Sequence, residues 1–493
     1  MLFNFMALAR KIAYNVVIVS ILKVVSTVFL SLFSIKLITG YLGQEGFGHY
    51  ATVLAFFAFF SAIADLGIGM ISVREISREN ADEKRILGNV FSLRLLSSGG
   101  IFLLSPFLIF FFGYSAELKE GILIAAFAII FSTMSLVLNG IFQKRVAMQE
   151  VAIIEFIGKV LQVSFIAFAV AKDWGFLSIV SAILVSMSFN AVSVFLMSRR
   201  HIRFPLRFER AYWKEFLRES YPLGVTAIIT FLYFKFDTII LSVLRPATDV
   251  GIYNVAYKIM ENLIFFPAML AGLIIPLLSK YLLSDRKKFD MIAGKTFKVF
   301  LIIVAPIVVG TLFLAEDIIL IVSGPSFLAS AEVLRVLVVS LFFIFFGHFF
   351  NMILLVSNAQ KKLMWTLSFA AFFNISLNLF LIPRYSYMGA ASASALTEGF
   401  VVLIASFIAF RHIGYRPSFR GLSPLILSSL GMATFLFLFH GRMPFLLTGL
   451  GAVLSYVSLL WLSKGVTREE IGIILSGRKL SRQNITDSGE MSL

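Results

Sequence analysis

The sequence predicts an all-α integral membrane protein with about fourteen transmembrane helices, and its composition, its apolar runs and an internal repeat support this. The 493 residues are 59% hydrophobic and only 14% charged, which is far more apolar than a soluble chain. Runs of about 20 apolar residues, enough to cross a bilayer core of roughly 30 Å, recur along the chain. These runs are continuous, whereas the strands of a membrane β-barrel are about ten residues long and alternate in polarity.

Fourteen helical spans can be placed on these runs. The first follows the basic pair Arg10 and Lys11 and is too long for a signal-peptide core, so we expect it to be retained. The approximate spans are residues 12–39, 47–71, 86–113, 118–141, 151–172, 175–197, 216–244, 250–280, 293–315, 331–356, 361–382, 387–411, 423–440 and 443–463.

Basic residues are distributed unequally between the alternate loops. With the N-terminus placed inside, 30 of the 43 Lys and Arg residues fall in or beside the predicted cytoplasmic loops. This asymmetry follows the positive-inside rule and predicts a multi-pass membrane protein with both termini cytoplasmic. It also explains most of the +16 net charge without a nucleic-acid partner. The predicted outer loops hold five: Lys119, Lys172, Arg245, Arg384 and Arg442.

A shift of 203 residues brings GFGHYATVL (46–54) onto the segment around VGIYNVAYK (250–258), and the first six spans onto the next six. Because each unit holds six helices, the two predicted lobes are parallel repeats related about the membrane normal. Such symmetry is typical of transporters that bind substrate between the lobes near the midplane. The predicted organisation is an N-lobe (1–200), a basic cytoplasmic linker (201–215), a C-lobe (216–411), two further spans (412–463) and a cytoplasmic tail (464–493).

Four basic residues lie too deep in the spans for simple snorkelling. Lys235, in FLYFKFDTIILS, is roughly 14 Å from the outer end of its span at 1.5 Å per residue, and an ionised group at that depth is costly. We expect a cationic central cavity that binds substrate. For Arg94, a bond to the backbone of a neighbouring helix is the alternative. The candidates are Lys23, Arg94, Lys235 and Lys258.

Local pairing is a second explanation for two of the embedded lysines. Glu155 and Lys159 have i, i+4 spacing, and Lys258 and Glu261 have i, i+3 spacing, so each pair could neutralise itself along one helix.

Three embedded acids are candidates for ion coupling: Asp65, Asp237 and Glu398. A carboxylate at such depth can bind a proton or Na⁺ and link its gradient to transport; hydrogen bonding between packed helices is the alternative. Asp237 stands two residues from Lys235, so on one helix the two side chains point to nearly opposite sides. We therefore expect two separate environments for this pair.

Catalytic and cofactor motifs are missing from the sequence. The absence of cysteine excludes disulfides and thiolate metal sites, and the five histidines show no metal-ligand spacing. No P-loop or nucleophile elbow occurs, so we predict no catalytic residue, no metal and no cofactor beyond a coupling ion.

Five longer motifs stand out along the chain: YLGQEGFGHYATV, ADLGI, REISREN, DVGIYNVAYKIMENLIFFP and RYSYMGAASASALTEG. With these motifs the chain resembles the Wzx-like polysaccharide and O-antigen flippases of the multidrug/oligosaccharidyl-lipid/polysaccharide (MOP) exporter superfamily, whose fold is that of MATE and MurJ.

The resemblance implies an inner-membrane protein that moves a polyprenyl-pyrophosphate-linked oligosaccharide from the cytoplasmic to the outer leaflet by alternating access. Because both predicted lobes lie in one chain, we expect a monomer. Membrane lipids and other polysaccharide-assembly proteins are the implied partners. A cationic cavity suits the anionic pyrophosphate. Three tyrosines could stack on sugar rings or pack between helices: Tyr233, Tyr253 and Tyr257.

Other functions stay open at this point. A lipid II flippase would share the fold and the cationic cavity. A multidrug exporter for organic cations calls for cavity carboxylates, whereas deep bases here are at least as many as deep acids. A membrane glycan polymerase or glycosyltransferase would be expected to show a long outer loop or an acidic catalytic motif, and neither is present.

Overall fold

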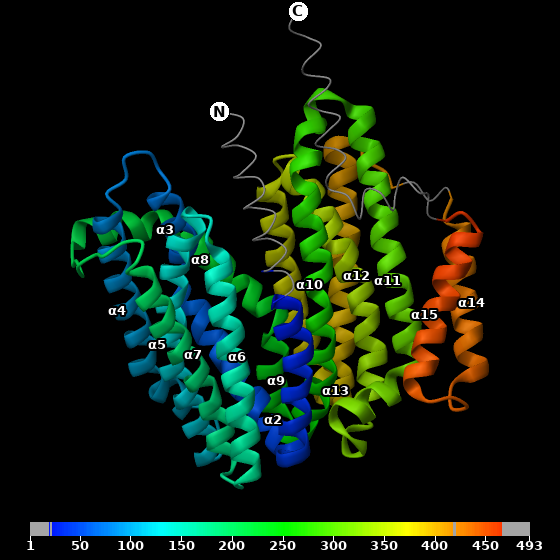
Figure 1. Ribbon diagram of the computed structural model, residues 1–493, viewed down its shortest axis with the longest axis horizontal. Coiled ribbons are helices and arrows are strands. Elements are labelled where there is room, and N and C mark those ends of the chain that lie inside the picture. Colours follow the sequence, from blue (N-terminus) through cyan, green and yellow to red (C-terminus); the bar gives the residue numbers. More distant parts are fainter. Residues whose placement is uncertain (1–18, 20–21, 418–420, 466–493) are drawn as a thin grey trace, which may run out of the picture. The chain divides into compact units, whose positions relative to one another are not determined.

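The computed structural model describes residues 19, 22–417 and 421–465 (Figure 1). Within these ranges all regular secondary structure is helical, and there is no strand. Arg10, Lys11, the start of the first predicted span and the predicted tail from residue 466 lie outside the described residues.

The described part of the chain folds into fourteen α-helices, with a π-helical turn η1 and a 3₁₀ turn η2. Their bounds are η1 (Val25–Leu30), α2 (Ser31–Asp65), α3 (Ile68–Ile76), α4 (Glu83–Phe110), α5 (Ala116–Lys144), α6 (Met148–Ala171), α7 (Phe176–Ser198), α8 (Arg210–Phe234), α9 (Phe236–Leu244), α10 (Ala247–Ser284), α11 (Arg286–Ser323), η2 (Pro325–Phe327), α12 (Ser330–Val356), α13 (Gln360–Ile413), α14 (Ser423–Phe439) and α15 (Phe445–Leu462).

The fourteen predicted spans can all be assigned to these helices. Ten helices of the described chain are long and apolar enough to cross a membrane. Two of them each contain two predicted spans, joined across kinks at Gly43 and Ser386. The bent pair α8 and α9 accounts for one further span, and the shorter helix α14 for the last. The prediction of an all-α, multi-pass membrane protein is confirmed.

Two predicted spans are interrupted where the sequence suggested continuous helices. The span predicted over residues 47–71 breaks after Asp65, because Leu66 and Gly67 have φ values of 45° and 72°. Gly67 is required here, since a Cβ atom would lie 2.4 Å from the Ser220 carbonyl oxygen on α8. The span predicted over residues 216–244 breaks at Lys235, where the helix axis bends by 51°.

The chain divides into two compact units. Unit 1 comprises Met1–Asn262, Ile319–Val333 and Leu367–Thr397, and unit 2 comprises Leu263–Ile318, Leu334–Thr366 and Glu398–Leu493. All the elements of the candidate site described below, except Glu398, belong to unit 1. The division into two six-helix lobes stays a prediction.

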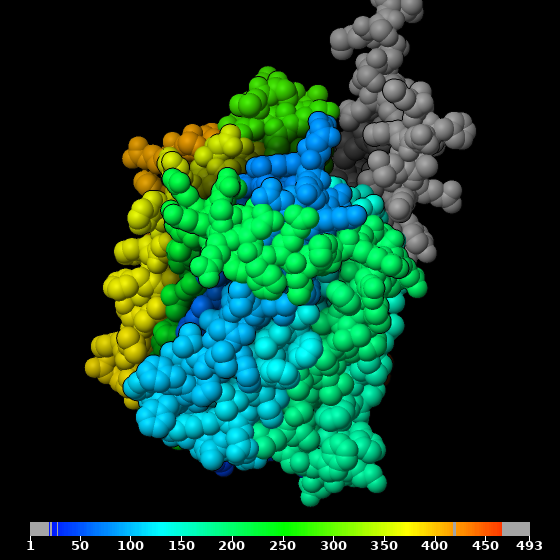
Figure 2. Space-filling model, turned by 90° about the vertical axis from the view of Figure 1, so that its left-hand side faces the viewer, coloured from blue at the N-terminus to red at the C-terminus, as the bar shows by residue number. Residues whose placement is uncertain are grey.

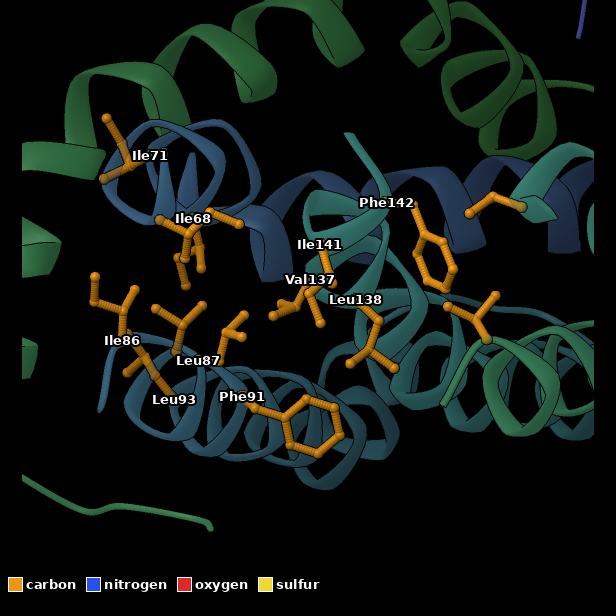
Figure 3. Close-up of a cluster of buried hydrophobic side chains, with 14 of the residues drawn as sticks. Ile68, Ile71, Ile86, Leu87, Phe91, Leu93, Val137, Leu138, Ile141 and Phe142 are labelled. Carbon is orange, nitrogen blue, oxygen red and sulfur yellow. The ribbon is translucent and has the colours of Figure 1, made fainter. Parts of the chain in front are cut away.

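The core of unit 1 lies between α3, α4 and α5, and α5 also packs along α7. Figure 3 shows side chains of these three helices pointing toward one another, among them Ile68, Leu87 and Leu138, each fully buried. Lipid tails are as apolar as these side chains, so close van der Waals packing, rather than removal from water, stabilises such a core. Gly140 on α5 allows this closeness, since a Cβ atom there would lie 3.1 Å from Val73 Cγ2.

The linker between α7 and α8 is bound along the first half of α4. The backbone N–H of Arg207 donates to the Gly88 carbonyl (3.2 Å), and that of Glu209 donates to Asn89 Oδ1 (2.9 Å). Arg85 forms an ion pair with the Glu209 carboxylate at 2.6 Å. Figure 2 shows this green segment lying across the blue region that contains the start of α4. The linker therefore fixes the beginning of α8, the helix that leads to Lys235.

Unit 2 has its own smaller core, in which α14 and α15 pack against each other. Leu436 and Ala452 are buried there, and the Tyr456 hydroxyl donates to the Ile302 carbonyl of α11 at 3.0 Å.

Candidate functional site

The candidate site is built around the helix break at Lys235. This residue has φ −130° and ψ −10°, which ends α8 at Phe234 and lets α9 begin at Phe236. The Phe234 carbonyl accepts a hydrogen bond from the Tyr257 hydroxyl of α10 at 2.5 Å. A broken helix inside a membrane needs such partners for its freed backbone groups.

Glu261 holds two lysines from different helices. Its Oε1 lies 2.5 Å from Lys235 Nζ, and its Oε2 lies 2.8 Å from Lys258 Nζ. The Lys235 ammonium also sits 4.6 Å from the centre of the Tyr257 ring, within range for a cation–π interaction. The i, i+3 pairing of Lys258 and Glu261 is confirmed, and the same carboxylate is shared with Lys235.

The charge around Glu261 remains unbalanced in favour of the bases. Lys159 on α6 is within electrostatic range of Lys258, and its ammonium donates to Gln162 at 3.1 Å. The pairing of Lys159 with Glu155 is not among the ion pairs of the described chain; Glu155 lies instead within electrostatic range of Lys23. Two ammonium groups thus contact the Glu261 carboxylate, and a third lies within electrostatic range of one of them, an arrangement suited to an additional anion.

Both lysines that bind Glu261 keep some accessible surface, 24% for each side chain. A charged group in the middle of an apolar span is stable only where water, a counter-ion or a polar partner reaches it. The cluster of Lys159, Lys235, Lys258 and Glu261, called the lysine cluster below, therefore has the chemistry of an accessible anion site.

Asp237 occupies a different environment on the far side of the break. Its side chain is buried, with the residue 3% exposed. Its carboxylate accepts hydrogen bonds from the Tyr253 hydroxyl and from the Thr238 N–H (2.6 Å). Asn254 and Ser394 add oxygens nearby, since Thr238 Oγ1 donates to Asn254 Oδ1 at 3.3 Å and Tyr253 contacts Ser394 at 3.5 Å.

The polar surroundings continue along α13 beyond Ser394. Asn374 donates to Thr397 Oγ1 (3.2 Å), and Asn378 donates to Asn374 Oδ1 (2.8 Å). Asn378 Oδ1 is buried and has no hydrogen-bond partner among the described residues. A buried carboxylate near several neutral oxygens can hold a proton or a small hard cation such as Na⁺.

Arg94 has a structural position. It is fully buried, donates to the Ala64 carbonyl (2.8 Å) and forms an ion pair with Asp65. It thereby satisfies the end of α2 where Leu66 interrupts the helix. This is the backbone contact that the sequence left open as the alternative for Arg94, so neither Arg94 nor Asp65 enters the proposals below.

The remaining sequence-predicted residues lie in varied surroundings. Lys23 is exposed, whereas Glu398 on α13 is buried. Tyr233, Tyr253 and Tyr257 are 8%, 0% and 3% exposed, so in this structure they pack between helices. Their stacking on sugar rings stays a prediction.

Glu261 and Lys159 were not predicted as site residues. Lys159 has i, i+4 spacing to Glu155, and Glu261 has i, i+3 spacing to Lys258. Each spacing suggested neutralisation along a single helix, so contacts between helices were not expected for either residue. The available signal was that Lys235 needed a carboxylate, and Glu261 is an acid on the following predicted span.

Comparisons with known proteins agree with this architecture. Residues 8–282 match the family model described as polysaccharide biosynthesis protein, and residues 222–380 match the MatE model. A Shigella flexneri protein assigned as an O-antigen transporter is 26% identical over 373 residues, 71% of this chain and 86% of the relative.

Two solved structures share the fold. A structure of the lipid II flippase MurJ in an inward closed conformation superposes with a TM-score of 0.76 at 18% identity, covering 90% of this chain and 98% of MurJ. An inward-facing MATE-family multidrug transporter superposes with a TM-score of 0.62 at 15% identity, covering 80% and 98%. At these identities the likeness concerns the fold alone. The family match over more than half of the chain shows that the protein belongs to the polysaccharide biosynthesis protein family.

Proposed function

We propose that the protein is a flippase that moves a lipid-linked oligosaccharide, bearing a pyrophosphate, from the cytoplasmic to the outer leaflet by alternating access. The lysine cluster carries this proposal, because Lys235 and Lys258 converge on a single resident carboxylate and Lys159 lies within electrostatic range of Lys258. Membership of the family and the long match to an O-antigen transporter support the same cargo class.

The cargo's pyrophosphate competes with Glu261 for Lys235 and Lys258. Both ammonium groups already point at one pair of oxygens, at 2.5 and 2.8 Å, so the cargo would meet preoriented donors. The resident Glu261 keeps the empty site neutral enough to be stable, and a phosphate with more charge displaces it. The lipid tail stays in the bilayer while the hydrated sugars cross beside the lysine cluster.

Coupling is assigned to Asp237, with a proton or Na⁺ as the ion. Its burial and its bonds to Tyr253 and Thr238 favour a group whose charge changes during the cycle. The protein acts in the inner membrane as a monomer with both termini cytoplasmic, without catalytic residues and without nucleic acid. The basic loops support this orientation.

The test is deletion of the gene followed by mass spectrometry of polyprenyl-linked glycans. The deleted strain is complemented with the parent, with Lys235→Ala, or with Lys287→Ala, an exposed lysine at the start of α11 that serves as the control. A complete pyrophosphate-linked repeat should accumulate in the deletion and with Lys235→Ala, and disappear with the control. Accumulation of lipid II instead would identify a lipid II flippase. An unchanged lipid-linked pool together with new drug sensitivity would replace the proposal by drug export.

A further inference from the structure

Two glycines that the internal repeat relates to each other meet in the structure. A Cβ atom added at Gly48 on α2 would lie 1.8 Å from the Ala247 carbonyl oxygen and 3.1 Å from the Gly251 nitrogen. A Cβ atom added at Gly251 on α10 would lie 2.2 Å from the Gln44 carbonyl oxygen and 3.3 Å from the Gly48 nitrogen. The two helices are therefore in backbone contact, which only glycine permits at both positions.

This contact has the symmetry of the repeat. The shift of 203 residues converts Gly48 into Gly251, and it also converts Gln44 into Ala247. Each glycine thus meets the carbonyl that is equivalent to the one its counterpart meets. Such reciprocity is what a pseudo-twofold axis between the two predicted repeats would produce.

Neighbouring side chains pack beside Gly48, in the part of α2 that begins after its kink at Gly43. The Gln44 amide donates to the Ser326 carbonyl of η2, and the ring of Phe47 packs against that of Phe327 with centroids 6.0 Å apart. Ser330 Oγ donates to the Ile252 carbonyl at 2.7 Å. Phe47 and Phe327 are 2% and 0% exposed, so this layer is tightly packed. The charge pattern of the loops assigns these helix ends to the outer face.

The C-terminal end of α2 is held in another way. Gly224 on α8 approaches Leu66, with 2.7 Å between an added Cβ atom and the Leu66 Cα atom. Here the neighbouring helix α3 is tied to α8 by the ion pair between Arg74 and Glu219, and Phe216 of α8 is buried in the core of unit 1. This end is part of the packed core, whereas the layer at Gly48 rests on backbone proximity, rings and single hydrogen bonds.

We propose that the contact of Gly48 with Gly251 is the outer gate of the transport path. The glycines are positioning residues: they let α2 and α10 close on each other, and they separate when cargo leaves for the outer leaflet. Since the gate serves the flippase activity, this inference rests on the proposed function. A side chain at either position would hold the outer end apart.

The absence of cysteine from the chain makes a direct test possible without background thiols. Gln44→Cys and Ser326→Cys are combined and bridged with a short bis-methanethiosulfonate linker that reductant cleaves. The bridged protein should lose nearly all transport and regain it after reduction, while each single-cysteine variant should transport at the same rate with and without the reagent. Equal transport in the bridged and reduced states would overturn the gate.

Glycine variants give a second readout that does not depend on transport. Gly48→Ala and Gly251→Ala should lower the yield of the 44–326 bridge on a gel. Gly272→Ala on the same helix α10 is the control, because a Cβ atom there meets nothing within 4 Å. An unchanged bridge yield in both alanine variants would contradict the inference. If deletion of the gene leaves the lipid-linked pool unchanged, the proposed function is wrong. If transport survives bridging, only the proposed gate is wrong.

Discussion

Lys235 and Glu261 lie 26 residues apart on different helices, yet the lysine Nζ and a glutamate oxygen are only 2.5 Å apart. The break between α8 and α9 makes this possible, since it lets Lys235 reach Glu261 while Asp237 bonds Tyr253 eight residues earlier on the same helix α10. One short apolar stretch therefore supplies both a base to the proposed anion site and an acid to the proposed coupling site.

Glu261→Gln should lower the thermal stability of the ligand-free protein but strengthen its binding of anions. The change removes the negative charge that both ammonium groups share, and partly exposed charge-assisted bonds of this kind contribute about 1–2 kcal/mol. The melting temperature should fall without ligand, and inorganic pyrophosphate should raise it more than it does in the parent. Glu120→Gln, an exposed glutamate on α5, should change neither value. A pyrophosphate-induced shift smaller than that of the parent would contradict the role of Glu261 as resident competitor.

Asp237→Asn should preserve folding while abolishing the response to an ion gradient. Asparagine keeps the volume and can still accept from Tyr253, but it cannot carry the charge. Transport in proteoliposomes, driven in turn by a pH gradient and a Na⁺ gradient, measures the effect. Tyr253→Phe removes one hydrogen bond and should reduce the rate without removing the gradient response. If Asp237→Asn still responds to both gradients, coupling resides elsewhere.

The spans could be predicted because each needs only its own hydropathy, and the repeat followed from matching motifs. The breaks at Leu66 and Lys235 could not, because backbone contacts with α8 and α10 decide them. Depth along a helix selected Lys235, Lys258 and Arg94 alike as candidates for a cavity, whereas the structure places the two lysines on Glu261 and Arg94 at the end of α2. Distinguishing a helix-end partner from an accessible base requires the tertiary contact itself.

Arg94→Ala should destabilise the protein strongly. The change leaves the Asp65 carboxylate and the Ala64 carbonyl without their partner, and breaking one side of a buried ion pair costs about 3–5 kcal/mol. Arg94→Lys should recover only part of this, because one ammonium lacks the planar fork that reaches both groups. Thermal unfolding in detergent measures both changes. Arg145→Ala, which removes a half-exposed partner of Glu83, is the control with an expected loss of about 0–1 kcal/mol.

The docking of the linker on α4 should weaken in acid. Hydrogen bonds from Arg85 and then Asn89 lower the pKa of Glu209 to about 2 from an ordinary value of 4.5. A depressed carboxyl pKa stabilises the docked state fully above the ordinary value and loses that effect as the pH falls toward the folded value. The window is therefore about pH 4.5 to 2. Pepsin, which is active there, should cut the linker near Phe204 and Phe208 faster as the pH falls through this range.

Two variants separate this effect from the pH dependence of the protease. Glu209→Gln loses the charge that Arg85 binds and should be cut faster at the upper end of the window, which flattens the difference between the two ends. Glu215→Gln, an exposed glutamate on α8, should behave like the parent. Identical cleavage profiles for the parent and Glu209→Gln would mean that the backbone bonds from Arg207 and Glu209 hold the linker without the ion pair.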